Sequence, residues 1–176
     1  MENSKFETAT FGGGCFWCTE AIFEEINGII DIKSGFSGGT VPGKPTYREV
    51  CSGLTGHAEV IQLKFDPELI SFKNIISIFM TTHDPTTLNR QGADCGTEYR
   101  SIILYHDMIQ KQVSELVINE MGQYYKDNIV TEISPYKIFY EADLEHQDYY
   151  KNNKGNRYCN IVIEPKLAKL RQLFRK

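Results

Sequence analysis

The chain has 176 residues, of which 41% are hydrophobic and 24% charged, and this composition predicts one globular domain over residues 1–176. The formal net charge of -4 argues against nucleic acid as a partner, because proteins that bind polyanions concentrate positive charge on one face. No stretch approaches the roughly 20 apolar residues that span a bilayer, and the N-terminal MENSKFETAT has no apolar core for export. We therefore expect a cytoplasmic monomer that contacts no membrane.

The first third of the chain predicts three strands and one helix. Residues 5–14 alternate as a short strand that ends in glycines, and residues 15–29 have apolar side chains near helical spacing. Residues 29–39 predict a second strand and residues 57–67 a third. The segment between them, residues 37–56, is rich in glycine and proline and is expected to be a loop.

The rest of the chain continues the alternation of helices and strands. We expect helices at residues 71–85 and 107–121, and strands at 99–106 and 128–133. The order strand, helix, strand, strand, helix, strand is that of the split βαβ arrangement. The predicted fold is therefore α+β, a ferredoxin-like two-layer plait with helices on one face of a sheet.

Two further segments complete this organisation. Residues 85–98 are expected to form a second long loop, and loops of that length in a compact domain tend to carry function. The C-terminal PKLAKLRQLFRK places Leu167, Leu170 and Phe174 at helical spacing with basic residues between them. It predicts an amphipathic helix that docks as a C-terminal extension.

The heptapeptide GGGCFWC is the sequence's strongest chemical signal. Cys15 falls at the junction of the first strand and the first helix, where unpaired N–H groups and the helix dipole favour a thiolate. Cys18 follows three residues later, as in thioredoxin-like redox pairs. The rings of Phe16 and Trp17 beside the thiol predict a pocket for an uncharged, apolar group of a substrate.

Three other interpretations of this stretch have weaker support. Structural zinc requires a second closely spaced ligand pair, yet Cys51, Cys95 and Cys159 each stand alone, so no metal is expected. A phosphate loop requires a Lys-Ser/Thr continuation that is missing. Inert, buried cysteines in a helix stay open on spacing alone.

Five ordered segments together resemble the A-type peptide methionine sulfoxide reductases over nearly the whole chain. These are GGGCFWC, PTYREVCSGLTGHAEV, HDPTTLNRQGADCGTEYRS, EADLEHQDYY and RYCNIVIEPK. The resemblance implies thiol-dependent reduction of the S epimer of methionine sulfoxide, free or in oxidised proteins, back to methionine. It also implies that thioredoxin, or dithiothreitol in vitro, is the reductant, with no bound cofactor.

The resemblance assigns roles to the residues around the thiol. Cys15 matches the nucleophile that attacks the sulfoxide sulfur and keeps the oxygen as a sulfenic acid, and Phe16 and Trp17 match the wall of the substrate methyl pocket. Glu59 matches the acid that protonates the sulfoxide oxygen, which requires a pKa raised by burial. Strand periodicity alone would make Glu59 a solvated residue.

Three further residues match the family's oxygen-binding site. Tyr47 and Tyr99 match two tyrosines whose hydroxyls bind the sulfoxide oxygen, and Asp94 matches an acidic residue that orients groups or holds water. His57 and His83 also lie in matching segments, but we assign them no proton transfer.

Recycling requires a second thiol that condenses with the sulfenic acid to give an intramolecular disulfide. By resemblance Cys159 is the first choice and Cys18 the second, because the side chain of Cys18 in a regular helix need not point at Cys15. A relay through both stays open. We expect Cys51 to be a buried small hydrophobe and Cys95 an incidental thiol.

The sequence departs from the family pattern at two places. Phe36 stands where the family usually has tyrosine, which removes one hydroxyl near the site. The glycine-rich tail with an additional cysteine is also missing, which puts a relay along the tail in doubt. Two rival functions remain: a general thiol-disulfide oxidoreductase that uses Cys15 and Cys18, and a module that binds methionine-rich peptides without chemistry.

Overall fold

The computed structural model describes residues 5–174, and within them one mixed sheet of six strands organises the chain. The strand order is β7-β6-β1-β3-β2-β8, and every neighbouring pair is antiparallel except β6 and β7. The strands are β1 (Glu7–Gly12), β2 (Ile29–Ser37), β3 (Ala58–Phe65), β6 (Ile102–Tyr105), β7 (Glu132–Pro135) and β8 (Phe139–Glu141). The prediction of a mixed helix-and-sheet fold is confirmed.

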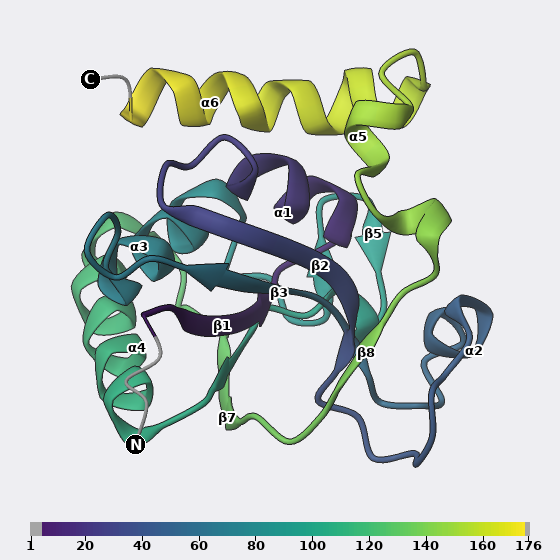
Figure 1. Ribbon diagram of the computed structural model, residues 1–176, viewed down its shortest axis with the longest axis horizontal. Helices are drawn as coiled ribbons and strands as arrows, with labels where there is room; N and C mark the ends of the chain where they lie inside the picture. The colour runs from purple at the N-terminus through teal and green to yellow at the C-terminus, as the bar shows by residue number, and fades with distance from the viewer. Residues whose placement is uncertain (1–4, 175–176) are drawn as a thin grey trace.

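Within residues 5–174, four longer helices accompany this sheet. They are α1 (Phe16–Phe23), α3 (Phe72–Thr82), α4 (Met108–Met121) and α6 (Glu164–Phe174). Figure 1 shows α1 between the sheet and α6, so the C-terminal helix lies on α1 rather than on the strands. Among the described helices, none is long and apolar enough to cross a membrane.

Strand alternation explains where the core lies. On β3, Ile61, Leu63 and Phe65 face the helices and join the main apolar cluster, while Val60 joins a smaller cluster on the opposite face. Phe11 of β1 packs in the main cluster, where its ring meets the ring of Phe23 of α1 edge-on, with the centroids 5.0 Å apart. Side chains on the helix-facing side of β1 and β3 therefore point toward the layer in which α1 lies.

Helix boundaries agree with the local sequence signals. Ser71 caps α3 by accepting a hydrogen bond from the Asn74 N–H at 3.1 Å, as its position predicted. Asp107 caps α4 in the same way. The first helix ends at Phe23, before the end of the segment 15–29 whose apolar side chains have near-helical spacing.

The structure corrects several expectations about the loops. The segment at 37–56 contains a short helix, α2 (Tyr47–Cys51), and the segment at 85–98 contains a small hairpin of β4 (Arg90–Gln91) and β5 (Asp94–Cys95). The predicted strand at 128–133 begins later, at Glu132. Proline and glycine mark where the chain turns, but they do not exclude a helical turn between two such positions.

The chain after β7 has few regular elements, and the sequence predicted none of them before the tail. It contains β8, η3 (Leu144–His146), α5 (Tyr149–Asn152) and a π-helical turn, η4 (Cys159–Ile163), that leads into α6. The remaining short helices are η1 (Thr97–Tyr99) and η2 (Gly122–Tyr124). The predicted tail helix is confirmed, with Leu167 and Leu170 buried.

Candidate active site

The glycine run positions the first cysteine. A Cβ on Gly12 would lie 2.1 Å from the Glu59 carbonyl oxygen, so only glycine lets β1 approach β3 this closely. Gly14 has a φ of +93°, a left-handed conformation that turns the chain into α1. As a result Cys15 stands at the N-cap of α1, at the helix-facing side of the sheet.

Cys15 is buried, with 6% of its surface exposed, and its sulfur hydrogen-bonds that of Cys18. Burial raises the pKa of Cys15 well above its usual value, and the hydrogen bond with Cys18 adds to this effect. The expectation that the helix N-terminus makes Cys15 the acidic thiol is therefore wrong, because the loss of solvation outweighs the favourable backbone groups.

Cys18 is the more acidic member of this pair. The hydrogen bond from Cys15 lowers the pKa of Cys18 to about 7. The two thiols are close enough for each to shift the pKa of the other, and the order of Cys159 and Cys18 as resolving thiols stays a prediction. Both thiols are free and buried, so the pair is a reduced, close-packed dithiol.

Glu59 lies at the start of β3 with only 1% of its surface exposed. Its Oε2 accepts a hydrogen bond from the Phe16 N–H at 3.0 Å, while its Oε1 is buried and has no hydrogen-bond partner among the described residues. Burial raises the pKa of Glu59 to about 8. The structure thus places a protonated carboxylic acid at the N-terminus of α1, with one oxygen left for another group.

Two tyrosines from separate loops lie beside this acid. Tyr47 begins α2, which Thr46 caps in a reciprocal pair of hydrogen bonds with Glu49. Tyr99 ends the short helix η1. Burial raises the pKa of both tyrosines, and the charge of Glu59 is the next largest cause for each.

The aromatic residues after Cys15 form part of a larger ring cluster. Phe16 is buried and packs on Phe36 and Tyr47, with centroids 5.6 and 6.4 Å away. Trp17 lies nearly parallel to Tyr149, with a centroid separation of 3.6 Å and an interplanar angle of 5°. A cavity of about 570 Å³ opens beside Trp17 and Tyr47.

His146 is a site residue that the sequence reasoning missed. Its Nδ1 accepts a hydrogen bond from Trp17 Nε1 at 3.2 Å, and its ring packs on Tyr47 at 4.5 Å. Burial lowers the pKa of His146, so it is held as a neutral acceptor. The only signal in the sequence was its place in the segment EADLEHQDYY.

Asp94 lies near both the buried acid and the dithiol, because, after burial, its charge helps to raise the pKa of Glu59 and of Tyr99. Its Oδ2 accepts a hydrogen bond from the Tyr158 hydroxyl at 3.0 Å, and that hydroxyl lies 3.6 Å from the Cys18 sulfur. Asp94 therefore connects to the dithiol through Tyr158, which sequence reasoning also missed.

The remaining cysteines divide into one buried and two exposed thiols. Cys159 is fully buried in η4, and its pKa is raised by burial first and by the charge of Cys18 second. Cys51 is exposed, so the expectation of a buried hydrophobe is wrong, although it hydrogen-bonds the Tyr47 side chain. Cys95 is exposed in the β4-β5 hairpin.

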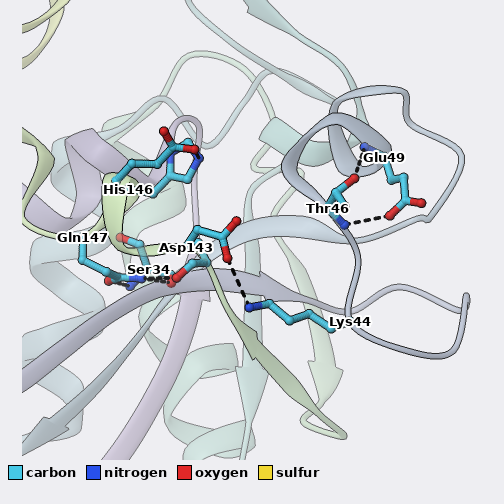
Figure 2. A network of polar contacts seen from close by, with 9 residues as sticks. Ser34, Lys44, Thr46, Glu49, Asp143, His146 and Gln147 are labelled. Carbon is cyan, nitrogen blue, oxygen red and sulfur yellow. Dashed lines mark hydrogen bonds and ion pairs between the residues drawn. The ribbon is translucent and has the colours of Figure 1, made fainter.

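Polar contacts join β2 and the loop after it to the segment after β8 (Figure 2). The Gln147 side chain accepts from the Ser34 N–H at 2.9 Å and donates to the Ser34 carbonyl at 2.8 Å. Lys44 pairs with Asp143 at 3.3 Å on the surface. These contacts hold the two segments that carry Tyr47 and His146 at one end of the sheet.

This geometry defines a class of protein, a thiol oxidoreductase with a buried acid and an aromatic pocket. The family model for peptide methionine sulfoxide reductase matches residues 7–176. Peptide methionine sulfoxide reductase MsrA of Saccharolobus solfataricus is 52% identical over 168 residues, covering 96% of this chain and 94% of the relative. The Deinococcus radiodurans protein of the same name is 50% identical, covering 96% and 82%.

Solved structures agree with this assignment. Mxr1 from Saccharomyces cerevisiae in reduced form has a TM-score of 0.84 at 34% identity, covering 90% of this chain and 91% of that one. Mxr1 in complex with Trx2 has a TM-score of 0.61 at 27% identity, covering 84% and 87%. The chain belongs to the peptide methionine sulfoxide reductase family, and it is a thiol-dependent enzyme that reduces methionine sulfoxide.

Proposed function

We propose that Cys15 and Glu59 reduce the S epimer of methionine sulfoxide in oxidised proteins, peptides or the free amino acid. The observation that carries this assignment is the buried Glu59 Oε1, which has no partner among the described residues while burial raises the pKa of this acid to about 8. A sulfoxide oxygen is an acceptor of the right kind for a protonated carboxyl. Phe16 and Trp17 would hold the substrate methyl group.

The first chemical step moves one oxygen from substrate to enzyme. As the Cys15 sulfur attacks the sulfoxide sulfur, Cys18, whose pKa is about 7, accepts the Cys15 proton through their hydrogen bond. Glu59 donates its proton to the oxygen, with the hydroxyls of Tyr47 and Tyr99 directed at the same atom. The oxygen then moves to Cys15 as the S–O bond of the substrate breaks, giving methionine and a Cys15 sulfenic acid.

Recycling would begin with Cys18, because it is hydrogen-bonded to Cys15. Its thiol attacks the sulfenic acid, which releases water and leaves a Cys15–Cys18 disulfide. Cys159, buried close enough to Cys18 for the charge of Cys18 to raise its pKa, could then exchange with that disulfide. Asp94 would act through the Tyr158 hydroxyl beside Cys18, as an orienting residue.

Thioredoxin is the proposed reductant of the final disulfide. The structure of Mxr1 in complex with Trx2 supports this choice. Dithiothreitol would replace thioredoxin in vitro, and the reaction requires no bound cofactor. We also propose a cytoplasmic monomer, and a central ferredoxin-like plait, which the antiparallel order β6-β1-β3-β2 supports.

Consumption of separate S and R epimers of a methionine sulfoxide peptide, with dithiothreitol as reductant, tests this proposal. We expect loss of the S epimer alone and no turnover by Cys15→Ser. Turnover of the R epimer, or a rate above background in Cys15→Ser, would overturn it.

A single turnover without reductant, followed by mapping of the disulfide, separates the resolving roles. If Cys18 resolves first, the Cys15–Cys18 disulfide forms in Cys159→Ser, whereas Cys18→Ser keeps the Cys15 sulfenic acid. The reverse pattern would make Cys159 the first partner of the sulfenic acid.

The Cys15–Cys18 hydrogen bond also favours one alternative function, a general thiol-disulfide oxidoreductase. That activity would reduce a protein disulfide such as that of insulin, and it would be insensitive to Glu59→Gln. A peptide-binding module without chemistry would instead bind equally well in Cys15→Ser.

A further inference from the structure

One face of α1 carries the pocket wall and two acids together. Trp17, Glu20 and Glu24 are spaced by three and four residues, so their side chains lie along the same face of the helix. That face contacts the chain segment 146–152, which begins at the last residue of η3 and includes α5. The acids have no role in the chemistry described above.

Glu20 is the buried member of this pair, with 3% of its surface exposed. Its Oε1 accepts a hydrogen bond from the Asp148 N–H at 3.0 Å, while its Oε2 is buried and has no hydrogen-bond partner among the described residues. Asp148 is the N-cap of the short helix α5, so Glu20 satisfies from another element one of the donors that α5 leaves free.

The bond to Asp148 holds a backbone that would otherwise relax. Asp148 has a φ of 51°, in the left-handed region that residues other than glycine rarely adopt. The Tyr149 ring that follows lies flat on Trp17 at 3.6 Å. A change in the backbone at these two residues would therefore move the ring that supports the pocket wall.

The negative charges of the acids near Glu20 are paired with a lysine at the surface, whereas the Glu20 carboxyl has no ion pair among the described residues. Glu24 and Asp148 lie near it, and the ammonium of Lys151 pairs with both, at 2.8 and 3.1 Å. Lys33 of β2 adds positive charge on the side of Asp148. Lys151 pairs with Glu24 and Asp148 but not with Glu20. The contact that Glu20 itself makes is the hydrogen bond to the backbone.

We propose that Glu20 is a positioning residue for the substrate pocket: it fixes the backbone of Asp148 and Tyr149 so that the Tyr149 ring holds Trp17 in place. This inference rests on the proposed function for the role of Trp17. The contacts that link Glu20 to Trp17 through Asp148 and Tyr149 do not depend on that function. Burial raises the pKa of Glu20 to about 7, and in either protonation state a carboxyl oxygen can accept the Asp148 N–H.

Trp17 is the single tryptophan in the chain, so its intrinsic fluorescence reports directly on the stack with Tyr149. We expect Glu20→Ala to shift and change the intensity of this emission in the reduced enzyme without substrate. Glu20→Gln retains an amide oxygen that can accept the same N–H, so it should keep the wild-type spectrum. Glu25→Gln is the matched control, because Glu25 pairs with Arg171 of α6 and not with segment 146–152.

Kinetics with the S epimer of the sulfoxide peptide provide the second readout. Loss of a charge-assisted hydrogen bond that only positions the pocket should raise KM about tenfold while kcat stays within about twofold. Glu20→Gln should restore KM to within about threefold of the wild type. This small remaining difference in KM is expected because a neutral acceptor replaces a charged one. Tyr149→Leu should raise KM similarly, and the two changes together should be less than additive.

The result that would overturn the proposal is a Glu20→Ala protein with wild-type fluorescence and KM. An equal loss of kcat in the alanine and glutamine variants would also overturn it, because that pattern indicates a chemical rather than a positioning role. If Glu20→Ala does not fold, Glu20→Asp shortens the side chain by one methylene and withdraws it from Asp148, and the same expectations apply. Failure of the proposed function would instead appear as an inactive wild type with an unchanged fluorescence comparison.

Discussion

Two buried polar groups lie on either side of the glycine run, and only one of them has all its partners. His83, next to Gly13, donates from Nδ1 to the Phe79 carbonyl at 2.6 Å and accepts at Nε2 from the Ser101 hydroxyl at 2.7 Å. Glu59, next to Gly12, uses Oε2 but leaves Oε1 without a partner among the described residues. The histidine has no free hydrogen-bonding group, whereas the acid keeps one oxygen free, as its proposed role toward the substrate oxygen requires.

The direction of the pKa shifts expresses the same difference. Burial lowers the pKa of His83 to about 4 and raises the pKa of Glu59 to about 8, so both groups are neutral near pH 7. A neutral histidine with two hydrogen bonds has nothing further to donate. A neutral carboxylic acid still holds a proton that it can transfer, which makes the same burial useful for chemistry at one site and for stability at the other.

Glu59→Gln should have the largest effect on activity. The amide keeps the shape and the bond to the Phe16 N–H, but it cannot transfer the same proton, so we expect kcat/KM to fall about 100- to 1000-fold. The free energy of unfolding at pH 8 should be unchanged or higher, because no buried charge can form. Turnover of the S epimer and urea unfolding measure the two quantities, and activity within fivefold of the wild type would contradict the acid role.

The glycines on the two sides predict different costs in stability. Gly12→Ala would place a Cβ 2.1 Å from the Glu59 carbonyl oxygen, so two hydrogen-bonded strands must move apart, and we expect a loss of about 3 kcal/mol. Gly13→Ala would meet the His83 ring at 2.6 Å, an obstacle that a side-chain shift can relieve in part. Urea unfolding at pH 7 should rank Gly12→Ala as the more damaging, and the opposite ranking would show that the strand contact is the softer one.

His83→Leu should reverse the pattern expected for Glu59→Gln. It leaves the Phe79 carbonyl and the Ser101 hydroxyl without their partner in the core, so we expect a loss of about 2 kcal/mol in unfolding free energy. Activity per folded molecule, measured at 10 °C to keep the variant folded, should stay within about twofold. A large loss of kcat in a fully folded His83→Leu protein would bring this histidine into the chemistry.

Much of the framework could be predicted from local sequence patterns. The strands at 57–67 and 99–106 and the helix at 71–85 follow from periodicity and capping, and the structure has them within a few residues. The burial of Glu59 was also accessible: on β3 it alternates with Ile61 and the other core-facing residues. The prediction of a solvated Glu59 was wrong because the core-facing alternation of Ile61, Leu63 and Phe65 continues back to Glu59.

The parts of the site that could not be predicted depend on contacts between distant segments. His146 and Tyr149 meet Trp17 across more than a hundred residues, and no periodicity around residues 142–153 marks them as pocket residues. The acidity of the thiols was wrongly predicted for a similar reason. A helix N-terminus is visible in the sequence, but the burial that raises the pKa of Cys15 depends on tertiary packing.

The smallest effect, a change in how stability depends on pH, separates the two buried groups most directly. The pKa of Glu59 rises from 4.5 to about 8 on folding, so its contribution to stability is fully present below pH 4.5 and is lost as the pH rises to about 8. The pKa of His83 falls from 6.5 to about 4, so its contribution is present above pH 6.5 and is lost as the pH falls through 4. The two groups therefore weaken the fold at opposite ends of the pH range.

Unfolding midpoints in urea between pH 4 and 9 test this difference. Glu59→Gln should remove the fall in stability between pH 4.5 and 8, and His83→Leu should remove the fall between pH 6.5 and 4; the two effects oppose each other only between pH 4.5 and 6.5. Activity should not follow His83: it should fall above pH 8 as Glu59 loses its proton and below pH 7 as Cys18 gains the proton that stops it accepting from Cys15. If Glu59→Gln keeps the wild-type alkaline slope, the acid is already ionised in the folded protein, and the proton for the sulfoxide oxygen must come from another group such as Tyr47 or Tyr99.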